Sequence, residues 1–323
     1  MCTAISITKK THLFGRTLDV AESYGEEVII TPRFSPLSFT DGEHTESHLA
    51  FIGAGIIRDG FVLYFDGMNE AGLAAAALNF PDYTKYESPA PEYNNIASFE
   101  VIPKILAKCK TVKEAKALLS LAKITDIPFS KALPPSPLHW IFSDKKEAVT
   151  AEQTKSGLHI YDNPCGILTN APDFPFHIKR LSEFSALSPK NPASTLINKH
   201  SFFSGGYGAL GLPGDFSSPS RFIRADFLSK YTKAESDGVS AFFHIMDSVS
   251  IPDGAMIGKE GKPHKTVYTA CMDTDSHVYY FHTYENRRIR AVRLEARAAS
   301  LSYPTHIPMY SPEDTELIPL TYK

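Results

Sequence analysis

Cys2 is the residue of this sequence that is best placed to do chemistry. A side chain as small as cysteine permits removal of Met1, which would leave a thiol and a free α-amino group on one residue. Reference pKa values are about 8.5 for a thiol and about 7.7 to 8.0 for an α-amino group. Small electrostatic effects of neighbouring groups can therefore bring either pKa close to neutral pH. Together they form a nucleophile and its base. By position alone, however, Cys2 is more often an incidental strand residue.

Two charged residues, Arg16 and Asp19, follow Cys2 on what we expect to be the neighbouring strand. A cation near a thiol favours the thiolate, and a carboxylate can hold an ammonium group. The alternative interpretation of this pair is an ordinary surface ion pair.

Three further polar residues occupy positions that suit a reacting carbonyl group. Asn79 and Asn170 stand at predicted strand ends, where a side-chain N–H could face a developing oxyanion, although asparagine there is also a common turn former. Arg221 follows Ser218 and Pro219, a serine cap with proline at the first helical position. Its guanidinium would emerge from a helix N-terminus, where it could equally be a solvated arginine.

The strands that must position these residues are indicated by alternation of apolar and polar side chains. Residues 2–8 alternate and predict a half-buried strand, and a polar turn at 9–12 leads into a second strand at 13–20, so the thiol opens the first strand. Short turns favour antiparallel neighbours. Further strands are predicted at 27–32, 49–57, 61–65, 73–78, 138–143, 148–152, 167–170, 266–272, 277–284 and 289–294.

Helices separate these runs of strands. Thr111 and Glu114 form a capping-box pattern, and apolar residues then recur on one helical face. Other helices are predicted at 99–108, 175–184, 219–231 and 239–249. Runs of strands and runs of helices predict an α+β fold of stacked antiparallel sheets covered by helices. Because no linker divides the chain, we expect one domain over residues 1–323.

Composition and charge exclude several classes of partner. The 33 basic and 36 acidic residues give a formal net charge of −3 without a basic stripe, which argues against nucleic acid. Residues 1–8 lack the pattern of a secretory signal, and the apolar stretches are short. We therefore expect a cytoplasmic protein that is not inserted in a membrane. The four cysteines form no C-x-x-C pair, so neither a zinc knuckle nor a redox dithiol is indicated.

Two motifs resemble cofactor sites and are rejected. Residues 206–211 match a dinucleotide fingerprint, but Leu212-Pro213-Gly214 follows where a helix should begin, so we assign the segment to a flexible surface loop. His44-Thr45-Glu46 with Pro164-Cys165 is similar to a zinc deaminase pattern, yet Leu168 replaces the second thiol. We expect no cofactor and no metal.

Several sequence blocks spread along nearly the whole chain form a joint pattern. The blocks are Met1-Cys2-Thr3, Phe14-Gly15-Arg16-Thr17-Leu18-Asp19, Asn69-Glu70-Ala71-Gly72-Leu73, Leu133 to Trp140, Thr169-Asn170, Gly211 to Asp215 and Ser220-Arg221-Phe222. In type and order, these blocks taken together resemble the choloylglycine hydrolase family, which includes bile salt hydrolases and penicillin V acylases.

The resemblance implies a role for each candidate residue. Cys2 would be the nucleophile with Arg16 and Asp19 as neighbours, Asn79 and Asn170 would lie near the oxyanion, and Arg221 would support the charge network. Arg224 replaces Arg221 if the helix register is off by one turn. The family also implies the four-layer αββα fold of the N-terminal nucleophile hydrolases, a homotetramer and no cofactor.

The resemblance further favours conjugated bile salts as substrates, because penicillin V acylases tend to carry tyrosine where this chain has Asn79. A sterol needs an apolar cleft, and residues 127–137 are our candidate for a segment lining its mouth. The alternatives are a penicillin V acylase or other N-acyl amidase of the same mechanism, a noncatalytic sterol-binding protein and a redox-sensing thiol protein. Candidate cleft residues, each equally suited to the core, are Leu18, Val20, Phe61, Phe65, Phe129, Leu133 and Leu138.

Overall fold

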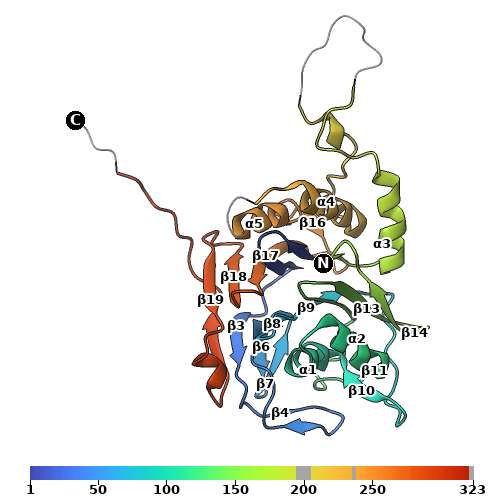
Figure 1. Ribbon diagram of the computed structural model, residues 1–323, viewed down its shortest axis with the longest axis vertical. Helices are drawn as coiled ribbons and strands as arrows, with labels where there is room; N and C mark the ends of the chain where they lie inside the picture. The colour runs from blue at the N-terminus through green and yellow to red at the C-terminus, as the bar shows by residue number, and fades with distance from the viewer. Residues whose placement is uncertain (194–204, 235–237, 320–323) are drawn as a thin grey trace, which may run out of the picture.

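Two large β-sheets lie face to face in the computed structural model, which describes residues 1–193, 205–234 and 238–319 (Figure 1). The first, here sheet A, has the order β15-β1-β2-β17-β18-β19, with β16 paired to β17. Its neighbouring strands are antiparallel. The strands of sheet A are β1 (Cys2–Thr8), β2 (His12–Val20), β15 (Ile167–Leu168), β16 (Met256–Ile257), β17 (Pro263–Asp273), β18 (Val278–Thr283) and β19 (Arg290–Arg293).

The second, here sheet B, has the order β14-β13-β12-β9-β8-β6-β3-β20, with β7 paired to β6. It is also antiparallel. Its strands are β3 (Glu27–Thr31), β6 (Phe51–Arg58), β7 (Phe61–Tyr64), β8 (Asp66–Asn69), β9 (Ala74–Asn79), β12 (Leu138–Ser143), β13 (Ala148–Thr154), β14 (Gly157–Asp162) and β20 (Thr305–Pro308).

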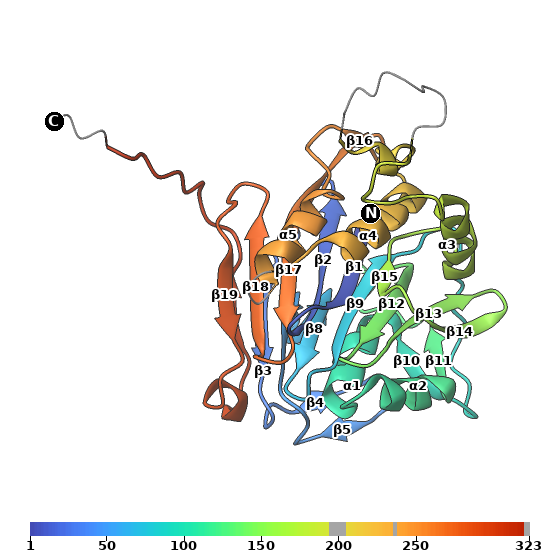
Figure 2. The ribbon, with the colours of Figure 1, turned by 45° about the horizontal axis from the view of Figure 1, so that its top comes forward.

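Helices cover the outer faces of both sheets. Helices α4 (Ser218–Tyr231) and α5 (Val239–Asp247) pack on sheet A, whereas α1 (Val101–Lys108) and α2 (Val112–Ser120) pack on sheet B (Figure 2). Helix α3 (Phe174–Leu181) follows β15. The predicted α+β sandwich of four layers, αββα, is therefore confirmed.

Two details of sheet A bear on the chemistry. Cys2 pairs with Leu18 across β1 and β2, so the thiol stands at the open end of the first strand. Gly15 packs directly against β17, because a side-chain methyl group there would lie 2.0 Å from the Ala270 carbonyl oxygen. The apolar core between the sheets lies beside this region and includes Phe14, Ile52, Met68, Ile141 and Phe281.

Some predicted elements need correction. Helix α4 begins at Ser218 with Ser217 as its N-cap, so Ser218 is not the cap that the sequence suggested. The segment assigned to a flexible loop contains a turn of 3-10 helix, Tyr207–Ala209. The sequence analysis did not predict several strands. These are β8, β14 and β20, the short β4 (Leu37–Ser38) and β5 (His44–Thr45), and the parallel pair β10 (Asn94–Ala97) and β11 (Ala122–Thr125). Within the described ranges, no helix is long and apolar enough to cross a membrane.

Candidate active site

The pleat of β1 and β2 divides the surroundings of Cys2 into two sides. Successive side chains of a strand point to opposite faces, so Arg16 and Asp19, three residues apart, lie on opposite faces of β2. Cys2 and Arg16 share the face that looks toward sheet B, while Thr17 and Asp19 share the face that looks toward α4. The thiol and the main-chain nitrogen of Cys2 therefore have different sets of neighbours.

On the thiol side, Arg16 is the neighbour. Its Nη2 lies 2.6 Å from Cys2 Sγ, and the guanidinium is anchored by donating to the main-chain oxygens of Ala77 (2.6 Å), Phe65 (3.1 Å) and Thr17 (3.1 Å). Burial alone opposes the cation, but the negative charges of Cys2 and its neighbours hold the pKa of Arg16 above its ordinary value. A fixed, buried cation therefore lies beside the sulfur.

On the nitrogen side, Asn170 is the main partner. Its Oδ1 accepts from Cys2 N at 2.8 Å and from Arg221 Nη2 at 2.7 Å, and two donors on one oxygen fix the orientation of the amide. Its Nδ2 donates to the main-chain oxygen of Asn79 at 2.7 Å. The two asparagines, predicted to share one region, therefore meet at the end of β1, and the side chain of Asn79 is exposed.

Asp19 and Arg221 form a buried charge pair below this nitrogen. Arg221 Nη1 lies 3.9 Å from Asp19 Oδ2 and donates to Cys2 O and Thr3 Oγ1, both at 2.5 Å. Asp19 also accepts from Thr266 Oγ1 at 2.6 Å. Burial lowers the pKa of Arg221, and the charges of Asp19 and Cys2 counter part of that effect.

Arg224 lies elsewhere. It donates to the main-chain oxygens of Pro213 (2.7 Å), Asp215 (2.9 Å) and Ser248 (2.9 Å). Of the two arginines that the sequence offered, Arg221 is therefore the one that reaches Cys2.

Met1 extends β1 beyond the thiol. Its amino group donates to Asp19 O, and Asp19 N donates to Met1 O at 2.9 Å. With Met1 in place, Cys2 is 3% exposed and its nitrogen is part of a peptide bond. Amine chemistry at Cys2 therefore requires cleavage of the bond between these residues.

The apolar candidates divide into core and half-buried residues. Leu18 is 5% exposed and belongs to the core between the sheets, whereas Val20, Phe65 and Leu138 are half-buried and Leu133 is 40% exposed.

Phe61 and Phe129 contact each other and also Phe99, which the sequence analysis missed. Ring centroids in this trio are 5.2 to 6.0 Å apart. Phe65 likewise packs against the exposed Tyr24 at 5.9 Å. Both missed aromatics come from segments that carry no motif, so only the three-dimensional contacts reveal them.

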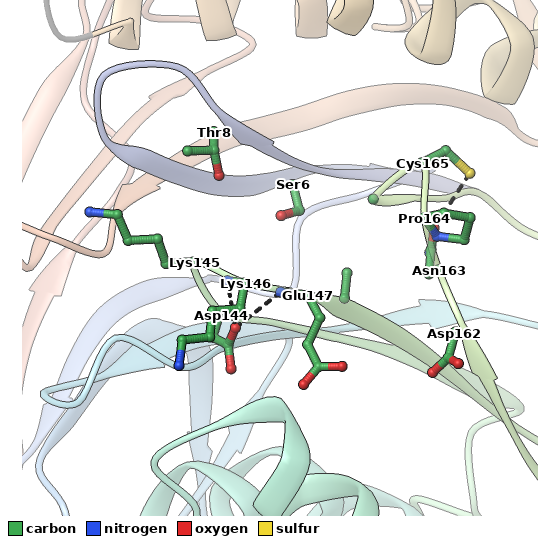
Figure 3. Close-up of a pocket in the computed structure, with 12 residues that line it drawn as sticks. Ser6, Thr8, Asp144, Lys145, Lys146, Glu147, Asp162, Asn163, Pro164 and Cys165 are labelled. Carbon is green, nitrogen blue, oxygen red and sulfur yellow. Dashed lines mark hydrogen bonds between the residues drawn. The ribbon is translucent and has the colours of Figure 1, made fainter.

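A separate cleft of about 300 Å³ opens at the Thr8 end of β1, opposite to Cys2 (Figure 3). Lysines and carboxylates mix along its wall, including Lys145, Lys146, Glu147 and Asp162. Such a lining does not suit a sterol body, which needs an apolar surface.

The sequence analysis also missed a buried, hydrogen-bonded pair near Asn170, His139 and Glu152. His139 Nδ1 lies 3.0 Å from Glu152 Oε1, and both side chains are 0% exposed. The available signal was a histidine inside the apolar run of β12 and a glutamate inside β13. In strands buried on both faces, such residues need each other as partners.

Comparison with known proteins gives a consistent result. A family model described as linear amide C–N hydrolases, choloylglycine hydrolase family, matches residues 2–305. A bile salt hydrolase/transferase of Lactiplantibacillus plantarum is 43% identical over 299 residues, covering 91% of this chain and 92% of the relative. A bile salt hydrolase/transferase of Clostridium perfringens is 36% identical over 302 residues, 90% of this chain and 92% of that protein.

Solved structures agree in architecture. A variant of the conjugated bile acid hydrolase of Clostridium perfringens superposes with a TM-score of 0.92 at 31% identity, covering 98% of this chain and 100% of that one. A penicillin V acylase of Agrobacterium tumefaciens gives 0.76 at 18% identity, over 95% and 91% of the two chains, which is a likeness of fold alone.

Proposed function

Because the chain belongs to the choloylglycine hydrolase family of linear amide C–N hydrolases, we propose that it hydrolyses the amide bond of glycine- or taurine-conjugated bile acids. Cys2 is the nucleophile of this proposal. The relatives described as acting on bile salts or conjugated bile acids support the choice of substrate.

One observation carries the proposal: the sulfur and the nitrogen of a single residue have separate, buried partners. Arg16 lies 2.6 Å from Sγ, and Asn170 lies 2.8 Å from the nitrogen on the other side of the strand. Once Met1 is removed, the α-amino group stays beside the thiolate without competing for the same partner. That is the arrangement that an N-terminal nucleophile needs.

In the first step, the Cys2 thiolate attacks the carbonyl carbon of the amide. The carbonyl oxygen becomes an oxyanion, and the α-amino group of Cys2 passes a proton to the leaving nitrogen as the C–N bond breaks. Glycine or taurine departs, and an acyl thioester remains on Cys2. Before the attack, the guanidinium of Arg16 balances the negative charge of the Cys2 thiolate.

In the second step, water attacks the thioester carbonyl. The α-amino group, now able to accept, takes a proton from this water, and the C–S bond breaks to release the bile acid and restore the thiolate.

Asn170 and the Asn79 segment stabilise the oxyanion in both steps. Nδ2 of Asn170 has two hydrogens, and one of them already donates to Asn79 O. The second is available for the oxyanion, as is the exposed side-chain amide of Asn79. Asp19 and Arg221 hold the main chain around Cys2.

The steroid body of the substrate would bind on two groups of aromatic side chains. The trio Phe61, Phe99 and Phe129 and the pair Tyr24 and Phe65 offer half-buried or exposed aromatic surface. We retain residues 127–137 as the segment lining the mouth.

Turnover of glycocholate, taurocholate and penicillin V by the purified protein tests the proposal. We expect release of glycine or taurine and much slower cleavage of penicillin V. A preference for penicillin V would favour the rival amidase. Equal bile salt binding by the unaltered chain and Cys2→Ser, with no cleavage by either, would favour a noncatalytic sterol-binding protein.

Three further properties are proposed with it: a single domain over residues 1–323, a homotetramer and a cytoplasmic location. None of the four cysteines, which all lie within the described ranges, forms a disulfide, and this suits a reducing compartment. Light scattering of the eluting protein would measure the assembly, and a mass other than four chains would contradict the tetramer.

A further inference from the structure

His139 lies between the two chain segments that bring Asn79 and Asn170 together. It belongs to β12, is 0% exposed, and its Nε2 lies 3.0 Å from the main-chain oxygen of Thr169. Its ring stacks on Phe80 with centroids 4.3 Å apart and an interplanar angle of 6°. Thr169 and Phe80 are the chain neighbours of the two asparagines, so one imidazole touches both segments.

Glu152 fixes the orientation of this imidazole. Its Oε1 lies 3.0 Å from His139 Nδ1, and its carboxylate also accepts from the main-chain nitrogen of Phe174 at 3.1 and 3.2 Å. Phe174 opens helix α3, shortly after Asn170. The carboxylate therefore joins β12, β13 and the chain that leaves Asn170.

The hydrogen-bond partners of His139 determine which of its ring nitrogens carries a hydrogen. Thr169 O can only accept, so His139 Nε2 must carry a hydrogen. The second nitrogen and the Glu152 carboxylate then share one proton, which makes this a charge-assisted or strongly polar pair in a site closed to water. Such a pair holds the ring more firmly than packing alone.

The main-chain polar groups of Asn170 are also occupied. Its main-chain oxygen accepts from His177 Nε2 at 2.9 Å, and its main-chain nitrogen donates to Ser218 Oγ at 2.8 Å. The backbone of residues 169 and 170 is thus held by the side chains of His139, His177 and Ser218, and of these three His139 is the one that also stacks on Phe80, next to Asn79.

We propose that His139, oriented by Glu152, is a positioning residue that sets the spacing of the Asn79 and Asn170 segments around the oxyanion. This rests on the proposed function, because it gives a task to the oxyanion site of that reaction. The imidazole touches neither sulfur nor substrate. It acts by fixing the Asn170 amide relative to Asn79.

Replacing His139 tests this with a readout that simple loss of packing would not produce. In His139→Ala we expect kcat for glycocholate to fall on the order of 10–100-fold with little change in KM, since a misplaced catalytic group of this kind costs about 10²-fold. Alkylation of Cys2 by iodoacetamide needs no oxyanion, so its rate should be unchanged. That rate also reports that the site has folded.

Two further variants guard against a folding defect. His139→Gln keeps an N–H within reach of Thr169 O and should recover part of the lost kcat, and Glu152→Gln should lose less than His139→Ala. A matched control is His12→Gln, which alters another buried histidine at the far end of β1 and should keep the kcat of the unaltered protein.

The outcomes separate the two proposals. If the unaltered protein cleaves no conjugate, the proposed function fails. If it cleaves conjugates and His139→Gln and His139→Ala both keep full kcat, or if kcat and alkylation fall together in both, the positioning role is wrong.

Discussion

Strand β1 carries a nucleophile-type side chain near each end, Cys2 and Ser6, and the comparison shows what separates chemistry from structure. They lie on the same face, four residues apart. Each contacts a nitrogen-bearing side chain of β2: Cys2 Sγ lies 2.6 Å from Arg16 Nη2, and Ser6 Oγ lies 3.0 Å from His12 Nε2. By contact alone the two ends look alike.

Charge distinguishes them. Burial lowers the pKa of His12 to about 4, so the cluster with Ser6, Ser143 and Thr274 is neutral near pH 7. At the other end, Arg16, Arg221 and Asp19 are buried with their charges. Burying charge is costly unless each group is paired, so three buried ionic groups at one end of β1 lower the stability of the fold. At the neutral end, the polar side chains hydrogen-bond to one another, and we interpret this cluster as structural.

The largest expected contrast comes from removing each nucleophile-type side chain. Cys2→Ala should abolish amide hydrolysis, a loss of at least about 10⁴-fold, as expected when a covalent nucleophile is deleted. Ser6→Ala should leave the rate nearly unchanged and cost on the order of 1–2 kcal/mol of stability for its two hydrogen bonds, to His12 and Ser143. Turnover and urea unfolding of both variants measure this. Equal losses of activity would erase the proposed distinction.

A second contrast concerns the cation beside the sulfur. Arg16→Gln should slow hydrolysis by roughly 10²- to 10³-fold, because a preorganised charge next to the reacting group is removed. Arg16→Lys should retain more activity, since it keeps the charge but not the planar fork. The rate of Cys2 alkylation near neutral pH should follow the same order. An alkylation rate that is identical in all three proteins would contradict a thiolate held by Arg16.

A smaller effect sharpens the comparison through stability at low pH. The pKa of His12 in the folded chain, about 4, lies below its ordinary value of 6.5. The unfolded chain therefore binds more protons in that window, and a contribution on the order of 3 kcal/mol, complete above pH 6.5, is lost as pH falls toward 4. His177, whose burial also lowers its pKa to about 4, adds a similar loss.

His12→Gln should consequently lose less stability than the unaltered protein between about pH 7.5 and pH 5. Urea unfolding at both pH values measures the difference, with His44→Gln as a control at an exposed position. If both variants lose as much unfolding free energy between the two pH values as the unaltered protein does, proton binding at His12 does not limit stability.

Sequence reasoning recovered the elements that have strong local signals. The alternation of residues 2–8, which predicts β1, and the Thr111 cap of α2, which accepts from Glu114 N, are local features. Strand β8 was missed because it is four residues long and runs into a turn, and β14 because it follows β13 through a tight turn at Gly157. Short strands depend on their neighbours for hydrogen bonds, which periodicity does not reveal.

The site shows the same division. The residue types at Cys2, Arg16 and Asn170 could be singled out from motifs, but the direction of the Asn170 amide could not, because it is set by Arg221 on a distant helix. Ser218 illustrates the point, since its hydroxyl bonds to the Asn170 backbone rather than capping α4. Glu152 and His139 are thirteen residues apart in sequence and meet only through the register of β12 and β13.

The central claim is that sulfur and a free α-amino group act from one residue, and the processing of Met1 tests it most directly. Intact mass and turnover should be measured for the natural chain and for one with a lysine inserted between Met1 and Cys2, which blocks methionine removal. We predict that the natural chain lacks one methionine and cleaves glycocholate, while the inserted chain keeps an alkylatable thiol but loses at least about 10³-fold in turnover. Full turnover by a chain that still carries residues ahead of Cys2 would contradict the account.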